Sequence, residues 1–408
     1  MPETPVKQSR KPVDGPFRQQ KLPAWQPVLT PRTVIPALFV IGVVFIPIGG
    51  LLYWNSGNVS ELMIDYTTCN QYTEPIYLDS TKYSLQFSTG FNQSSLESPA
   101  FHVESASEFL DSSWKNPNNL VIQRCILDFT VPETMTGPLF MYYRMTNFYQ
   151  NHRQYIKNYD ATQLSGDIVD QSTLNTNCGP LGVNQDNLVI YPCGLVANSM
   201  FNGTVFLRIV YVIHASIDTA SDLVSVTSNA SYSFQRTGIA WPTDKKKYGV
   251  TKYKNSEIVP PPNWSLRYPD GKYTDEYPAP DLSNMERLMV WMHMAALPDF
   301  RKIWGRNDVD PLQAGRWRIA IDMNFDTTIY GGNKWLVIST TSPLGGRNPR
   351  LGIGYIAIGV ISIFFGILFA LRHCFKPRKL GDQSYLSWNQ PGGGLPATKR
   401  IKKTLHQN

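Results

Sequence analysis

The chain has 408 residues, with 38 Lys and Arg, 31 Asp and Glu, and 5 cysteines. Two segments, residues 33–54 and 351–371, contain no charged residue. At about 1.5 Å of helical rise per residue, each can cross the ~30 Å hydrocarbon core of a bilayer. This excludes a soluble enzyme, a cleaved secretory protein and a multi-span transporter acting alone, and it predicts a membrane protein with two transmembrane α-helices.

The charge distribution predicts the orientation. The two tails, residues 1–32 and 372–408, together carry 14 Lys and Arg but only 3 acidic residues, whereas acidic residues outnumber basic ones in residues 55–350. By the positive-inside rule, both tails are expected in the cytosol and the central segment in the lumen or outside the cell. The first span is interpreted as an uncleaved signal anchor. The basic tails suit anionic lipids or acidic partner surfaces, and no zinc-finger spacing or basic-aromatic stripe indicates nucleic acid.

Four cysteines lie in the central segment, at Cys69, Cys125, Cys178 and Cys193, and Cys374 follows the second span. An even number of cysteines in an oxidising compartment predicts two disulfides, for which three connectivities are open.

Five Asn-x-Ser/Thr sequons also lie in the central segment. Glycosylation is expected at Asn92, Asn202 and Asn229. Asn58 is too close to the first span, and Asn263 has Trp as the middle residue of its sequon.

Alternating apolar and polar residues predict half-buried strands in the central segment. The clearest run places Trp317, Ile319, Ile321, Met323 and Phe325 on one face. Shorter runs occupy residues 83–87, 122–131, 140–145, 206–214 and 334–340. Together with 30 prolines and 29 glycines, they predict a large, mainly antiparallel β ectodomain, disulfide-bonded and glycosylated.

One helix is predicted between the strands. Ser283 and Glu286 have the spacing of a capping box, and apolar residues then recur at helical spacing until Pro298 ends the helix. Its Met residues and Trp291 are expected to pack in the core.

No motif for catalysis or cofactor binding is found. The histidines have no metal-ligand spacing, and the sequence lacks a phosphate-binding loop and a Gly-x-Ser-x-Gly elbow. We therefore expect no catalytic residue, no cofactor and no metal.

The second span carries a stripe of small residues. Gly352, Gly359 and Gly366 recur every seven residues, and Ser362 lies on the same side. Because small residues allow close approach of another helix, this stripe predicts packing against a partner protein. The first span contains Pro47, which is expected to bend its outer half.

Several phrases of the sequence closely resemble one family, the accessory (β) subunits of phospholipid flippases, also called the cell-division-control-fifty and ligand-effect-modulator family. The resemblance extends in order over residues 17–388, and the phrases YPDGKYTDE and SYLSWN resemble its fungal branch. The phrases are FRQQKLPAWQP (17–27), IPIG (46–49), IDYTTC (64–69), TNFYQNHR (146–153), YPCGLVANSMFN (191–202), GIAWPTDKKKY (238–248), IVPPPNW (258–264), AALPDFRK (295–302) and GGRNP (345–349).

The resemblance implies a non-catalytic subunit that forms a heterodimer with the catalytic subunit of a type-four P-type ATPase. Such a subunit is needed for exit of the ATPase from the endoplasmic reticulum, for its stability, and for moving membrane phospholipids from the luminal or outer leaflet to the cytosolic leaflet. The expected locations are the Golgi, endosome or plasma membrane. The resemblance also implies the disulfides Cys69–Cys125 and Cys178–Cys193, and a glycan on Asn202.

Two departures from the family pattern are visible. Relatives read WMRTAALP where this chain has His293 in place of the Arg, which predicts the loss of any salt bridge that the Arg made. The segment between Thr204 and Gly238 looks longer than in relatives.

Two other classes of function remain open from the residues. A two-span ion channel fits the topology, but its spans would be expected to carry more polar residues and its ectodomain more cysteines. A surface receptor would also fit a glycosylated β ectodomain.

Overall fold

The computed structural model describes residues 15–17, 20, 22–23, 29–87, 96–110, 116–200, 219–323, 326–342 and 345–377. It divides into a helical unit, from residues 1–51 and 350–408, and a central domain, residues 52–349. Helices α1 (Pro31–Gly57) and α8 (Pro349–Phe375) have 27 residues each and are long and apolar enough to span a membrane. Both extend beyond the predicted spans at each end.

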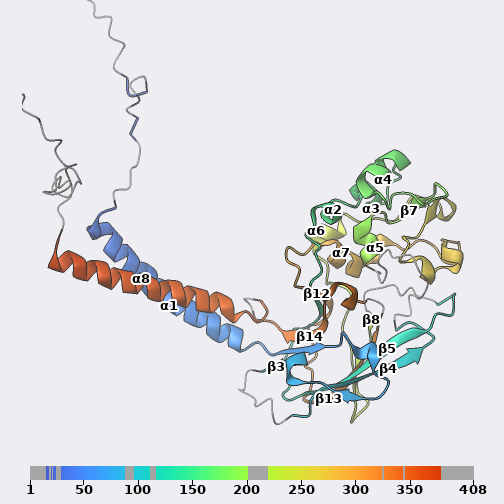
Figure 1. The fold of residues 1–408 in the computed structure, drawn as a ribbon, viewed down its shortest axis with the longest axis horizontal. Coiled ribbons are helices and arrows are strands. Elements are labelled where there is room, and N and C mark those ends of the chain that lie inside the picture. Colours follow the sequence, from blue (N-terminus) through green and yellow to red (C-terminus); the bar gives the residue numbers. More distant parts are fainter. Residues whose placement is uncertain are drawn as a thin grey trace, which may run out of the picture. The chain divides into compact units, whose positions relative to one another are not determined.

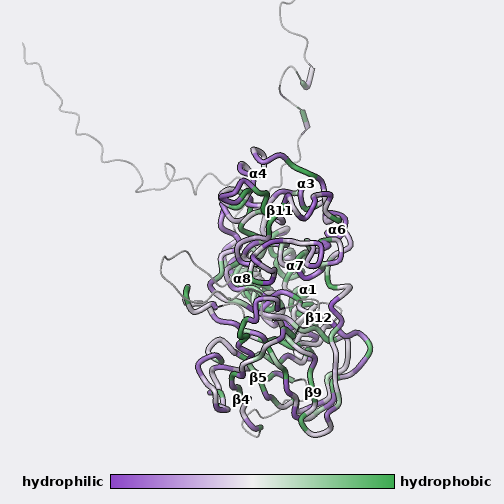
Figure 2. Tube along the Cα trace, turned by 90° about the vertical axis from the view of Figure 1, so that its right-hand side faces the viewer, coloured by the Kyte–Doolittle hydropathy of each residue, from purple (hydrophilic) through white to green (hydrophobic). Residues whose placement is uncertain are grey.

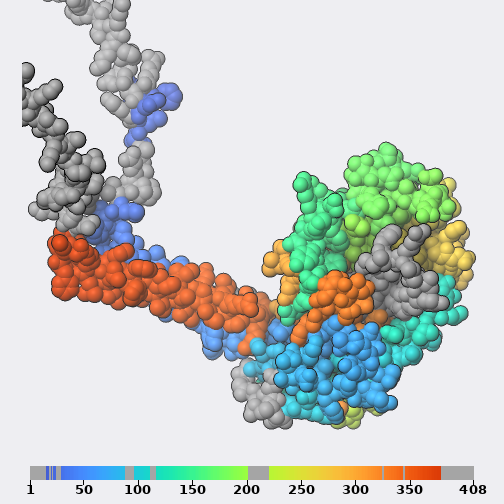
Figure 3. Space-filling model, in the orientation of Figure 1, coloured from blue at the N-terminus to red at the C-terminus, as the bar shows by residue number. Residues whose placement is uncertain are grey.

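Within the helical unit, α1 and α8 lie side by side (Figures 1 and 3). A Cβ atom added to Gly359 would lie 2.7 Å from Cγ1 of Ile46, and one added to Gly49 would lie 2.8 Å from the carbonyl oxygen of Gly352. The rings of Phe45 and Tyr355 are 5.1 Å apart. The two backbones therefore approach closely because glycines line the contact on both helices.

The central domain contains two antiparallel sheets, as predicted. The first has the strand order β12 (Phe300–Asn307), β6 (Leu139–Met145), β14 (Lys334–Thr340), β1 (Glu61–Asp65) and β3 (Tyr83–Gln86). The second has the order β10 (Ser231–Tyr232), β9 (Leu223–Ser225), β13 (Gly315–Asp322), β5 (Ile122–Val131), β4 (Ala100–Ala106) and β2 (Ile76–Tyr77), and β8 (Thr219–Ala220) also pairs with β13.

Side chains from both sheets share one hydrophobic core, so the sheets pack as a sandwich. Trp317, Ile319 and Ile321 are buried, as their alternation predicts. Figure 2 shows hydrophobic and hydrophilic stretches interleaved along the trace. Asp322 departs from the pattern: it is fully buried, and its carboxylate accepts a 2.7 Å hydrogen bond from Arg124. The predicted strand at 206–214 and Phe325 lie outside the described residues.

A second core belongs to a part of the central domain built from short helices. Its elements are α2 (Arg153–Ile156), α3 (Ala161–Leu164), α4 (Gln171–Cys178), α5 (Leu195–Ser199), α6 (Pro242–Lys245), α7 (Glu286–Met292) and the parallel pair β7 (Val189–Ile190) and β11 (Ile258–Val259). Phe300 of β12 and Met145 of β6 contribute to this core, which joins it to the first sheet.

Each core contains one disulfide. Cys69–Cys125 attaches a 3-10 turn to β5 in the sandwich, and Cys178–Cys193 ties the end of α4 to the loop that precedes α5. This is the connectivity that the family resemblance implied. Cys374 is free and exposed.

The predicted helix at 283–298 is shorter than expected. It begins at Glu286 and ends at Met292, and Ser283 lies in a separate 3-10 turn where it bonds to Asp281. The capping-box interpretation is wrong because the carboxylate of Glu286 is engaged by another segment, described below.

The segment that looks longer than in relatives is part of the sandwich where it is described. Residues 219–238 supply β8, β9 and β10. Leu223, Tyr232 and Phe234 are buried in the sandwich core. This half of the segment is therefore built into the fold.

Candidate functional site

Several of the phrases that carry the resemblance meet at α5. The indole nitrogen of Trp264 donates to the carbonyl of Ala197 at 3.1 Å, and that of Trp291 donates to the carbonyl of Val196 at 2.9 Å. Both tryptophans are almost completely buried. Because a buried indole N–H needs an acceptor, these bonds fix α5 against α7 and the IVPPPNW segment.

A second junction joins TNFYQNHR to AALPDFRK. The side-chain oxygen of Gln150 accepts from the amide of Ala295 at 2.9 Å, and the side-chain amide of Asn151 donates to the carbonyl of Ala296 at 2.9 Å. The ring of Phe148 lies 5.6 Å from that of Trp291. The segment after α7 is thus positioned by side chains from a distant part of the chain.

Beside this junction is a cavity of about 820 Å³, which we call the α6–α7 cavity. Its walls come from α6, the end of α7 and the strands β6 and β12 of the first sheet. It is lined by Phe140, Tyr142, residues 238–242, 244–245, 289–290, 293–295, 301–303 and Arg306. The phrases GIAWPTDKKKY and AALPDFRK, which are separated by residues 249–294 in the sequence, therefore share one concave surface.

Glu286 holds the GIAWPTDKKKY segment in place. Its carboxylate accepts hydrogen bonds from the amides of Ile239 (2.8 Å) and Ala240 (2.9 Å) and from Nζ of Lys245 (2.5 Å). Burial alone would raise the pKa of Glu286, but these donors outweigh it and hold the pKa below its ordinary value. The charged carboxylate thus holds the GIAWPTDKKKY segment, which forms one wall of the cavity, against α7.

Lys302 is buried on the opposite wall, with 6% of its surface exposed. Its Nζ donates to the carbonyls of Val290 (3.1 Å), Trp291 (2.6 Å) and His293 (2.8 Å). These carbonyls lie at the end of α7, where helical carbonyls lack partners. Burial lowers the pKa of Lys302 to about 7.

At the rim, His293 stands where relatives have an Arg. Its Nδ1 lies 3.4 Å from a carboxylate oxygen of Asp244, and its ring centroid lies 5.1 Å from that of Trp241. An acidic side chain is therefore within reach of position 293, and the loss of a salt bridge relative to the Arg stays a prediction. Trp241 itself is 64% exposed.

Two arginines of the lining are already paired. Arg301 pairs with Glu61 at 2.7 Å and Arg306 with Asp308 at 2.6 Å, and both guanidinium groups lie over aromatic rings. An exposed Trp beside arginines is typical of protein–protein contact surfaces.

The predicted glycosylation sites are placed in part. Asn229 is exposed in the turn between β9 and β10, whereas Asn92 and Asn202 lie outside the described residues. Asn263, the sequon that was disfavoured, is buried and its side-chain amide donates to the carbonyl of Asn198.

The small-residue stripe faces the chain's own first span. Gly352, Gly359, Ser362 and Gly366 are the buried residues of α8, and the glycines border α1. A partner helix in the membrane would therefore meet the larger exposed side chains of the pair, such as Val360 and Phe364.

Lys302 and Trp241 were not identified from the sequence. A signal for Lys302 was present: in β12 it stands between Phe300 and Trp304 at the strand period, on the face that turns inward. Trp241 had no such signal, because a single Trp before Pro242 does not show in the sequence whether its ring is buried or exposed.

Taken together, the apolar helices and the disulfide-bonded sandwich define an integral membrane protein with two spans and a large β domain. The sequence model of the LEM3 (ligand-effect modulator 3) family / CDC50 family matches residues 52–379, and the chain belongs to this family.

Named relatives are similar over nearly their whole lengths. The phospholipid-transporting ATPase accessory subunit CDC50 of Chaetomium thermophilum is 37% identical, over 93% of this chain and 92% of the relative. The accessory subunit CRF1 of Saccharomyces cerevisiae is 37% identical, over 94% and 90%. Cell cycle control protein 50A of Mus musculus is 35% identical, over 90% and 91%.

Proposed function

We propose that this chain is the non-catalytic accessory subunit of a type-four P-type ATPase that moves phospholipids from the luminal or outer leaflet to the cytosolic leaflet. The observation that carries the proposal is the 37% identity, over 93% of the chain, to a relative named as an accessory subunit of a phospholipid-transporting ATPase. The subunit and the ATPase form a heterodimer, and the subunit supports exit of the pair from the endoplasmic reticulum and the stability of the ATPase.

The α6–α7 cavity is the proposed docking site for a luminal segment of the ATPase. Trp241 offers a large exposed ring at its rim, and the tilted ring of His293 packs against it. Such pre-positioned aromatic side chains lose little conformational freedom on binding. If the contacts are stronger in one conformation of the ATPase, the subunit shifts the transport cycle towards that conformation without any active-site residue.

The proposed topology places residues 1–32 and 372–408 in the cytosol and residues 55–350 in the lumen or outside the cell. Cys374 offers a direct test, because it is exposed and the four central cysteines are in disulfides. A membrane-impermeant thiol reagent should label intact vesicles of native orientation on the cytosolic face only. Labelling from the luminal face would contradict the topology. The proposed locations are Golgi, endosome or plasma membrane.

The test of function is a mild-detergent pull-down of the tagged, full-length chain from its native membranes, with co-purifying proteins identified by mass. A P-type ATPase recovered in roughly equal amount is expected. Recovery of the chain alone or as a homotrimer would contradict the proposal and favour the channel or receptor alternatives.

Two matched variants test the docking site in the same experiment. Trp241→Ala removes the exposed ring at the cavity, and Tyr77→Ala removes a similarly exposed ring, 61%, from β2 of the second sheet. We expect Trp241→Ala to lower the recovery of the ATPase and Tyr77→Ala to leave it unchanged. Equal recovery with both variants would place the contact elsewhere on the subunit.

A further inference from the structure

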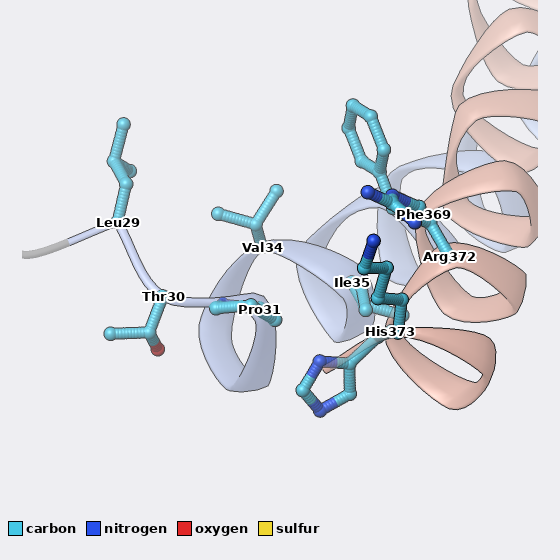
Figure 4. A pocket seen from close by; sticks show the side chains of 9 residues that line it. Leu29, Thr30, Pro31, Val34, Ile35, Phe369, Arg372 and His373 are labelled. Atoms are coloured by element: carbon cyan, nitrogen blue, oxygen red, sulfur yellow. The ribbon is translucent and has the colours of Figure 1, made fainter. Parts of the chain in front are cut away.

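A second cavity, of about 430 Å³, lies within the helical unit, between the start of α1 and the end of α8 (Figure 4). We call it the span-end cavity. One part of its lining is apolar and comprises Val34 and Ile35 of α1 and Phe369 of α8. The other part is basic and comprises Arg372, His373 and Lys376, in the last turn of α8 and just beyond it.

The basic side chains are not used by the fold. In the described part of the chain, the side chains of Arg372, His373 and Lys376 form no hydrogen bond or ion pair, and no Asp or Glu is among the described lining residues. Two permanent positive charges and a titratable imidazole therefore face one small volume without an anion.

The depth of the span-end cavity along the membrane spans indicates what kind of ligand it binds. The uncharged stretch of α8 ends at Leu371, so Arg372 begins where the hydrocarbon core of a bilayer gives way to headgroups. A soluble anion would use the basic side chains but not the apolar wall. A phospholipid matches both, because its phosphate and its acyl chains meet at this depth.

We propose that the span-end cavity binds an anionic phospholipid, with its phosphate against Arg372, His373 and Lys376 and the start of its acyl chains along Val34, Ile35 and Phe369. A zwitterionic lipid fits less well, because its amine would add a positive charge to a lining that has no acid. This lipid site belongs to the accessory chain itself and is separate from any transport path through a partner ATPase.

The test uses the full-length chain in nanodiscs of phosphatidylcholine with a minor fraction of phosphatidylglycerol. Phosphatidylglycerol is anionic and has no amine, which separates binding from transport of aminophospholipids. Lipid retained after extraction is identified by native mass spectrometry. We expect phosphatidylglycerol to be retained in preference to phosphatidylcholine, and Arg372→Gln to weaken this retention about fivefold, the effect of one basic residue at a membrane surface.

Two controls distinguish a built site from general attraction to the membrane. Arg350→Gln removes an exposed arginine from the other end of α8 and should leave retention unchanged. Val34→Trp fills the cavity and leaves every charge in place, and it should abolish the preference. Equal effects of Arg350→Gln and Arg372→Gln, or full retention by Val34→Trp, would overturn the proposal.

A third arm distinguishes a lipid from a free anion. Glycerophosphate added to the aqueous phase carries the same phosphate without acyl chains. Retention of phosphatidylglycerol should be insensitive to it, whereas its displacement at modest concentration would assign the basic cluster to a soluble phosphate and overturn the lipid assignment. Size-exclusion profiles verify that the variants fold, which is expected for Arg372→Gln because this side chain has no partner in the described structure.

Discussion

The ammonium group of Lys302 donates a 2.6 Å hydrogen bond to the backbone carbonyl of Trp291 and lies 4.8 Å from the centroid of the same residue's indole ring. Strand β12 of the first sheet thereby supplies the hydrogen-bond donor for the carbonyls at the end of α7. Helix α7 carries both Glu286, which binds the GIAWPTDKKKY segment, and Trp291, which binds α5. The Lys302 contact therefore helps to position both of these side chains.

Replacing Lys302 by Met should destabilise the central domain by about 1–3 kcal/mol, because three carbonyls lose their donor, and that of Trp291 is buried. Chemical denaturation of the purified chain in detergent measures this. Lys272→Met changes an exposed lysine and should have little effect. Equal midpoints for the two variants would show that the carbonyls find other donors.

Lys302 also predicts a pH dependence. Its pKa in the fold is about 7, below its ordinary value of 10.5. The unfolded chain therefore binds more protons between these two values, and stability should rise as the pH increases from about 7 towards 10. The Lys302→Met variant should lack this part of the rise, whereas Lys272→Met should keep it.

Replacing Glu286 by Gln should release the wall of the α6–α7 cavity that contains Trp241, at a cost of about 1–3 kcal/mol. Glu276→Gln, on an exposed loop, is the matched control. Because the pKa of Glu286 is lowered, its contribution is present above the ordinary value of 4.5 and lost as the pH falls through the lower folded value. Acid unfolding curves of the two variants should differ in that window.

Replacing Gly359 by Leu should separate the two spans, because even its Cβ would lie 2.7 Å from Ile46. Gly354→Leu is the control, since a Cβ there meets nothing within 4 Å. Cysteines introduced at Phe45 and Tyr355, whose rings are 5.1 Å apart, report the contact by cross-linking. The cross-linked fraction should fall several-fold with Gly359→Leu only; a fall with both variants would indicate a general loss of insertion.

Replacing Asn229 by Gln should remove one glycan, seen as a gel shift that glycosidase treatment abolishes. Its exposure in the turn between β9 and β10 makes the sequon accessible. Replacing Asn263 by Gln should not change the mobility, because Asn263 is buried and bonded to Asn198. If Asn229 variants run like the unmodified chain before and after the enzyme, this sequon carries no glycan.

Much of the sandwich could be predicted from local pattern. Residues 122–131 and 334–340 are the observed strands β5 and β14, because alternation reports directly which face of a strand is buried. The helix at 286–292 was predicted to be longer than it is, because tertiary contacts override the local pattern there. Its apolar spacing continues to Pro298, but Gln150 and Lys302 engage the backbone after Met292 in non-helical contacts.

The α6–α7 cavity could not be predicted from pattern, because its walls come from segments far apart in sequence that meet only in the tertiary structure, through contacts such as those of Glu286 and of His293 with Asp244. Glu286 has the spacing of a cap to Ser283, and only the tertiary structure shows that distant amides take its carboxylate. The small-residue stripe is similar: spacing indicates that a helix packs there, but it does not identify the helix.

The pairing of α1 with α8 has a consequence for biosynthesis. Gly42 and Gly49 of α1 are buried by a helix that the ribosome makes last, after almost 300 further residues. During that time the glycine face of the first span is open to lipid or to any other helix nearby. Closing that face requires the second span, so the membrane part of the protein reaches its final arrangement only when translation of the whole central domain is complete.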